Sequence, residues 1–79
     1  MKIYDFDGAK NICGAGVRAA RRRLKLSQAE LAAKLQTEGI NIERDSVSRI
    51  ELGTRFVADY ELMVLAKVLS ISVEELLVK

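Results

Sequence analysis

The sequence contains no histidine, no proline and no tryptophan, and it has a single cysteine, Cys13. Without histidine the chain has no imidazole to act as a general base, and its one cysteine cannot complete a zinc cluster. A lone cysteine also cannot form an internal disulfide, so we expect a reducing, intracellular setting. Cys13 has the character of a small core residue, and we expect it to be buried. We expect no metal and no cofactor.

Aromatic residues are also scarce, at 5% of the 79 residues, whereas hydrophobic residues make up 49%. This apolar fraction is enough for the core of one small domain, and its aliphatic character favours short helices over a sheet. No apolar run approaches the ~20 residues that a membrane-spanning helix needs. The first residues alternate charged and apolar side chains, unlike a signal peptide. We therefore expect a soluble, cytoplasmic protein with no membrane partner.

Positive charge is unevenly distributed, although the net charge is only +2. The first 25 residues carry seven Lys or Arg and two Asp, whereas the remaining 54 carry six basic and nine acidic residues. A basic cluster on one face attracts phosphate groups even when the total charge is modest. From charge alone, a solvated helix surface is an equally good interpretation.

Residues 1–10 are predicted to be an N-terminal arm, either extended or disordered, because Gly8 and the mixed charges give no periodic signal. Residues 11–79 are predicted to form one domain. Its first helix should begin near Asn11, a good N-cap residue, and run to Leu24 or Lys25. Gly14 and Gly16 weaken its beginning, so a start nearer Ala15 is the alternative. Its apolar stripe, spaced by three and four residues, should be Val17, Ala20 and Leu24.

Two capping boxes mark the starts of later helices. Ser27 with Glu30, and Ser72 with Glu75, have the spacing in which the hydroxyl and the carboxylate each accept from the other residue's amide. Asp59 is expected to cap the fourth helix. The second to fifth helices are therefore expected over about residues 27–38, 43–52, 59–69 and from 72 onward, with Ile40 and Ile42 pointing inward before the third.

Two stretches of sequence carry a resemblance to a known family. Residues 26–35 read LSQAELAAKL, and residues 46–53 read SVSRIELG. Together with residues 59–77 they resemble the phage repressor and Cro-like (Xre-type) helix-turn-helix family. The resemblance implies an all-α, five-helix lambda-repressor-like domain, not an enzyme, that binds double-stranded DNA as a homodimer and represses transcription. The segment 36–41 is longer than the turn usual in this family.

The third predicted helix has a polar face opposite Val47 and Ile50. A guanidinium group can donate to O6 and N7 of guanine together, so Arg44 and Arg49 are candidates for reading bases. Asp45 either accepts from cytosine N4 or holds Arg49 as its partner four residues away, and we favour the second role. By resemblance and exposure, the predicted base-reading set is Arg44, Asp45, Ser48 and Arg49.

The amides at the start of the second helix, with Gln28, are expected to bind a phosphate. The alternative is that Ser27 and Glu30 only cap the helix. The resemblance implies that Arg55 contacts the DNA backbone and that Glu51 pairs with Arg21 of the first helix. The alternative for that pair is two independent surface charges. The predicted backbone-contacting set is Ser27, Gln28, Ser46 and Arg55.

The alternative function is a protein-interaction module of the same fold, for example an antitoxin that masks a toxin. Leu77 and Val78 are apolar and near the C-terminus, so they would suit either such a protein partner or a homodimer. An enzyme is disfavoured, because the carboxylates fall at capping or solvent positions and not in a pair.

Overall fold

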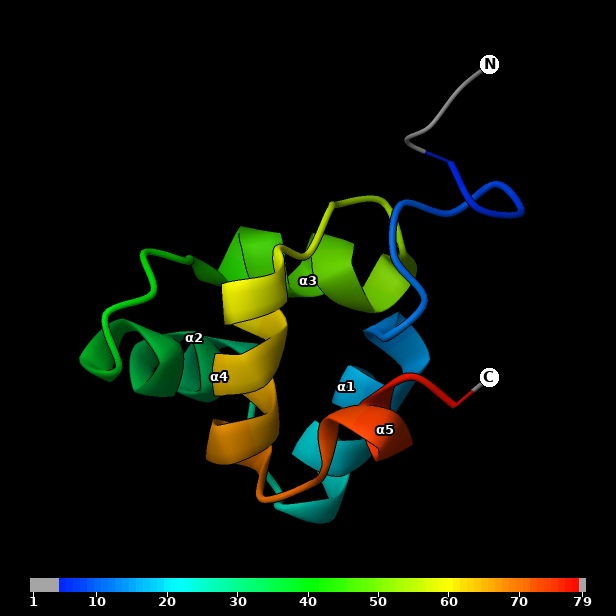
Figure 1. Cartoon of the computed structure of the whole chain (residues 1–79). Helices are drawn as coiled ribbons and strands as arrows, with labels where there is room; N and C mark the ends of the chain where they lie inside the picture. The colour runs from blue at the N-terminus through cyan, green and yellow to red at the C-terminus, as the bar shows by residue number, and fades with distance from the viewer. Residues whose placement is uncertain (1–4, 79) are drawn as a thin grey trace.

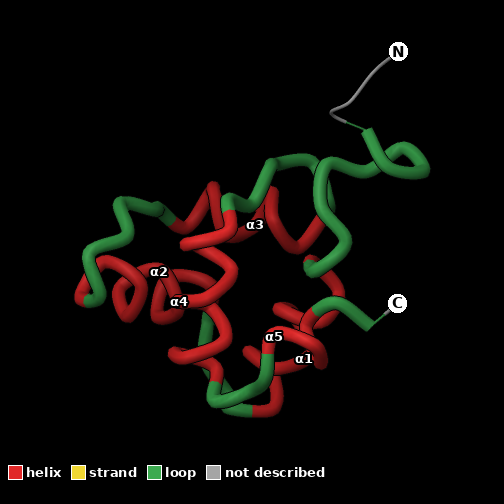
Figure 2. Tube along the Cα trace, viewed as in Figure 1, coloured by secondary structure: helices red, strands yellow, loops and turns green. Residues whose placement is uncertain are grey.

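The computed structural model describes residues 5–78, which form five α-helices and no β-strand (Figures 1 and 2). The predicted all-α fold with five helices is confirmed. No helix in this part of the chain is long and apolar enough to cross a membrane. The helices are α1 (Gly14–Arg23), α2 (Gln28–Thr37), α3 (Arg44–Leu52), α4 (Asp59–Leu69) and α5 (Val73–Leu76).

The five helices surround one hydrophobic core. α3 packs against both α1 and α2, α4 packs against α2, and α5 lies on α1 (Figure 1). Cys13 is 2% exposed, as predicted, and burial raises the pKa of its thiol. The buried apolar side chains come from all five helices and from the connections: Cys13, Val17, Ala20, Leu31, Ala32, Leu35, Ile40, Ile42, Val47, Ile50, Leu65, Ala66, Leu69 and Leu76.

Both predicted capping boxes are present. The Ser27 hydroxyl accepts from the Glu30 amide at 3.0 Å, and the Glu30 carboxylate accepts from the Ser27 amide at 2.7 Å. The same reciprocal bonds join Ser72 and Glu75, at 3.1 and 3.4 Å. These hydrogen bonds satisfy amides that the first turn of a helix leaves without partners, so they fix where α2 and α5 begin.

The connection between α2 and α3, residues 38–43, is long, as the sequence predicts. Gly39 ends α2 with a left-handed φ of 89°, a conformation that favours glycine. Ile40 and Ile42 then point into the core, at 9% and 1% exposed. The Gln36 side-chain amide donates to the Ile42 carbonyl at 2.8 Å and braces the connection.

The start of α1 differs from the prediction. Asn11 does not begin the helix; its side-chain oxygen accepts from the amide of Gly14, the first helical residue, at 2.9 Å. Its side-chain amide donates to the Ile50 carbonyl at 3.1 Å. The Lys10 amide also donates to the Gly53 carbonyl at 2.8 Å. Asn11 and Lys10 therefore fasten the segment before α1 to the end of α3.

Two predictions about helix ends are wrong. Leu24 is 43% exposed and not part of the α1 stripe, because Lys25 turns the chain away with a left-handed φ of 59°. Asp59 does not cap α4 but is its first helical residue. Ala58 holds the cap position, and the Glu61 carboxylate accepts from the Ala58 amide at 3.0 Å.

The described part of the predicted arm is a tight turn. Phe6 and Ala9 exchange two backbone hydrogen bonds, at 2.7 and 3.0 Å. Asp7 and Gly8 between them both have positive φ, the backbone of a two-residue hairpin turn. The sequence signal for this turn was the Asp-Gly pair itself. The remainder of the arm prediction, residues 1–4, lies outside the described residues.

Gly14 allows α1 to cross α3 at close range. A Cβ atom at Gly14 would overlap the Ile50 carbonyl oxygen and lie 3.0 Å from that of Glu51. Both of these atoms belong to the backbone, so neither can move without shifting α3. The glycine that weakens the start of α1 is therefore what lets the two helices approach.

We expect Gly14→Ala to lower the free energy of unfolding by about 3 kcal/mol, because α1 and α3 would have to separate. The control is Gly39→Ala, whose Cβ would meet nothing within 4 Å and whose left-handed φ alone costs about 1 kcal/mol. Urea unfolding of both variants measures the difference. Equal reductions would show that the helices tolerate a side chain at their crossing.

Candidate nucleic-acid interface

Helix α3 buries one side and exposes the other. Val47 and Ile50 are 1% and 0% exposed and face the core. α3 packs against α1 and α2, which lie below it in the view of Figure 1. Ser48 is the least exposed of the predicted base-reading side chains on the opposite side, and the others point into solvent. That side carries Arg44, Asp45, Ser48 and Arg49.

Asp45 pairs with Arg44 and not, as we favoured from the sequence, with Arg49. The Arg44 guanidinium donates to the Asp45 carboxylate at 3.1 Å, in the first turn of α3. The side chains are 61% and 65% exposed, so the pair adds at most about 1 kcal/mol to stability. Arg49 forms no ion pair with any residue of 5–78.

The start of α2 lies beside α3. The Gln28 side-chain amide donates to Glu51 of α3 at 3.1 Å, and Gln28 is half-buried. Ser27, which precedes it, is exposed, and its hydroxyl caps the helix. Ser46, the other serine predicted to contact the DNA backbone, is half-buried in the first turn of α3.

The predicted ion pair between the first and third helices is present. Arg21 donates to the two Glu51 oxygens, from Nε at 2.6 Å and from Nη2 at 3.0 Å, and Nη1 donates to the Leu26 carbonyl at 2.7 Å. The two side chains are 11% and 3% exposed. Hydrogen bonding to Glu51 raises the pKa of Arg21 above its ordinary value. A buried pair with two parallel bonds fixes the orientation of α3 more than it adds stability.

Arg55, predicted to contact the DNA backbone, is engaged within the protein. Its guanidinium donates to both Glu61 oxygens, at 3.0 and 3.2 Å, and to the Phe56 carbonyl at 2.8 Å. Glu61 is 8% exposed. This pair was not predicted, although Glu61 stands three residues after the helix cap, where a carboxylate reaches back to the helix start. Arg55 therefore holds the loop after α3 against α4.

The pKa of Glu61 reflects opposing influences. Burial alone would raise it, but the hydrogen bonds from Arg55 and from the Ala58 amide, with the charge of Arg55, bring the pKa below its ordinary value of 4.5. A carboxyl group with a lower pKa in the folded state stabilises the fold above the unfolded-state pKa. This stabilisation disappears as the pH falls through the folded-state pKa.

We expect Glu61→Gln to lower the free energy of unfolding at pH 7 by about 2 kcal/mol, because Arg55 loses a charged partner. Below pH 4.5 the wild type loses the same stabilisation, so the difference between the two proteins should shrink. Urea unfolding from neutral to acid pH measures this difference, with the exposed Glu43→Gln as the control. A difference that stays constant with pH would contradict the assignment.

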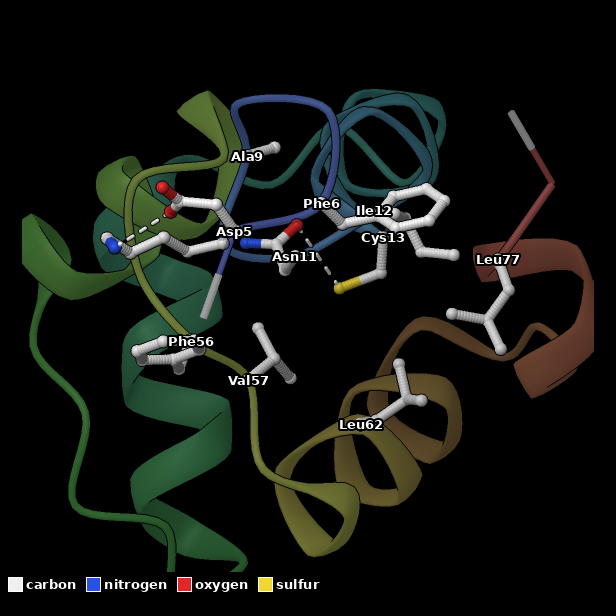
Figure 3. A pocket seen from close by; sticks show the side chains of 11 residues that line it. Asp5, Phe6, Ala9, Asn11, Ile12, Cys13, Phe56, Val57, Leu62 and Leu77 are labelled. Carbon is white, nitrogen blue, oxygen red and sulfur yellow. Dashed lines mark hydrogen bonds and ion pairs between the residues drawn. The ribbon is translucent and has the colours of Figure 1, made fainter. Parts of the chain in front are cut away.

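An apolar hollow of about 410 Å³ lies away from the exposed side chains of α3, between the N-terminal turn, the loop after α3 and helices α4 and α5 (Figure 3). Three of its large apolar side chains remain exposed: Phe6 at 57%, Phe56 at 46% and Leu77 at 37%. The Lys10 ammonium lies over the Phe56 ring, 5.2 Å from its centre. Such a surface has the chemistry of a protein contact.

The comparisons with known proteins agree with this geometry. Residues 17–76 match the family described as "Helix-turn-helix". The crystal structure of the DNA-binding domain of BldD is similar, with 27% sequence identity and a TM-score of 0.74 over 94% of this chain and 100% of that one. No curated protein matches this sequence.

The match covers the α2–α3 pair and the helices that support it, so the resemblance and the lambda-repressor-like fold predicted from the sequence are both confirmed. The family consists of non-enzymatic, DNA-binding transcription regulators. This chain belongs to the phage repressor and Cro-like (Xre-type) helix-turn-helix family.

Proposed function

We propose that this protein binds double-stranded DNA sequence-specifically, with α3 in the major groove, and represses transcription by occupying its site. The exposed face of α3, with two arginines pointing into solvent, carries this proposal. A helix of nine residues is about 14 Å long and enters a groove about 12 Å wide. This role fits the cytoplasmic location predicted from the sequence.

Arg44 and Arg49 are the proposed base readers, each donating two hydrogen bonds to O6 and N7 of a guanine. Asp45 accepts from Arg44 in the free protein, so it holds that guanidinium over the first turn of α3. A carboxylate repels the phosphate groups of every sequence alike, and its ion pair with Arg44 offsets that repulsion. Ser48, between the two arginines, is the fourth proposed base contact.

The proposed backbone contacts come from Ser27, Gln28 and Ser46, at the starts of α2 and α3. Exposed amides and the positive end of a helix dipole favour a phosphate at these positions. Arg55 was also predicted to bind a phosphate, but Glu61 already neutralises its charge. We therefore propose that Arg55 supports the interface by holding the loop after α3.

We propose that two copies of the chain meet through the apolar hollow and the exposed side chains next to it. Phe6 and Val78 border a second hollow beside Leu52 and Gly53, at the C-terminal end of α3. A dimer contact here leaves the N-terminal turn of α3, with Arg44, available to DNA. The two α3 helices of such a dimer would occupy major grooves about 34 Å apart.

The same apolar hollow favours the second candidate function, a protein-interaction module such as an antitoxin. The hollow would then hold a side chain of a different protein. Recognition of a particular duplex sequence by α3 distinguishes the two functions, because masking a partner protein requires no base contact.

Sites selected from a random duplex pool should be inverted repeats that contain guanine. We expect Arg49→Ala to lower the ratio of affinities for the selected site and for random DNA by about 100-fold, the value of one bidentate base contact at each half-site. Gel-shift titration at fixed salt measures the ratio, with the exposed Lys34→Ala as the control. Discrimination retained by Arg49→Ala would overturn its role.

We expect the double substitution of Leu77→Ser and Val78→Ser to weaken self-association and to lower affinity for an inverted repeat about 10-fold, because the two half-sites are then bound less cooperatively. Affinity for a single half-site should stay the same, because α3 is untouched. Met63→Ser, which removes an apolar side chain 63% exposed on α4, is the control. Sedimentation of the free protein and titration of both duplexes test this. A variant that still dimerises would place the contact elsewhere.

A further inference from the structure

Four arginines stand on α1, and three of them line a hollow shared with α2 and α3. Arg18 and Arg22 are four residues apart and therefore lie on one face of the helix. Opposite them are Gln28, at the start of α2, and Ser48, on α3. The hollow measures about 310 Å³, and we call it the arginine notch.

The base of the arginine notch is electrically neutral. Arg21 and Glu51 both border it, and their charges cancel in the buried ion pair. Both Glu51 oxygens are already occupied, one by Arg21 Nε at 2.6 Å and the other by Arg21 Nη2 at 3.0 Å and the Gln28 amide at 3.1 Å. Glu51, the acid that lines the notch, therefore has little capacity left to attract a further cation.

The walls of the notch are positively charged. Arg18 and Arg22 supply this charge, and both residues are exposed. Neither forms an ion pair within the described part of the chain. Two exposed guanidinium groups over a neutral base favour an anion, and the planar fork of guanidinium matches the oxygens of a phosphate group.

The notch is continuous with the exposed face of α3. Ser48 borders it and follows Arg44 by four residues, so these two side chains stand on the same stripe of the helix. Leu52, one turn further along, is 73% exposed at the edge of the notch. A duplex lying against α3 would therefore bring one of its strands to α1.

We propose that the arginine notch binds a phosphate of the DNA backbone through Arg18 and Arg22, on a strand beside the groove that α3 occupies. The proposal deepens the proposed function and rests on it. A phosphate held by α1 carries no sequence information, but it fixes the distance and angle at which α3 meets the bases. The Arg21–Glu51 ion pair at the base of the notch joins α1 to α3, so a phosphate bound by α1 constrains the orientation of α3.

The test is the salt dependence of binding to a random-sequence duplex. Arg18→Gln with Arg22→Gln should reduce the slope of log affinity against log salt by about 0.9 for each phosphate that the variant no longer neutralises. The matched control is Arg23→Gln with Lys25→Gln, which removes the same charge from the end of α1 and the residues after it. Arg23 lies in a different hollow, beside Ile71 and Glu75. The control should change the slope by less than half as much.

Retention of the wild-type slope by Arg18→Lys with Arg22→Lys would support a phosphate contact, since that pair keeps both charges. Equal effects of the notch pair and the control pair would overturn the proposal in favour of diffuse attraction. If Arg49→Ala lowers discrimination while the notch pair leaves the slope unchanged, only the notch proposal fails. If the wild type binds no duplex, the proposed function fails and the notch proposal with it. Thermal unfolding verifies that each variant is folded.

Discussion

Arg21 of α1 donates two hydrogen bonds to Glu51 of α3, and both side chains are almost fully shielded from solvent. A third hydrogen bond from Arg21 reaches the Leu26 carbonyl, just before α2. Gln28, in the first turn of α2, adds a bond to the same carboxylate. One carboxylate thus fixes three helices relative to one another. Gly14, at the start of α1, lets this helix approach the backbone carbonyls of Ile50 and Glu51, so α1 meets α3 closely beside the ion pair.

The arginines of this domain differ in whether a nearly buried acid neutralises them. Arg21 and Arg55 are bound to the nearly buried acids Glu51 and Glu61, so they act within the fold. Arg18, Arg22 and Arg49 form no ion pair among residues 5–78 and are available to a ligand. The net charge of +2 conceals this division, because it counts both groups alike.

The two ends of α3 have different surroundings. The side chains proposed to meet bases begin with Arg44 and Asp45 in its first turn and continue to Ser48 and Arg49. Its last turn is joined to the N-terminal segment through the Lys10 and Asn11 bonds and borders the apolar surface proposed for a second copy. The apolar surface borders α3 at Leu52 and Gly53, and neither Ser48 nor Arg49 lines it, so one short helix can take part in both proposed contacts.

The sequence by itself determined the family, the five helices and the starts of α2 and α5, because a capping box acts within four residues. By resemblance it also identified the Arg21–Glu51 pair. Only the tertiary structure decided that Arg55 binds Glu61, that Asp45 binds Arg44 and that Asn11 reaches Ile50. The partner of a long side chain depends on how the loops and helices bring charges together, and local spacing allows several partners for the same residue.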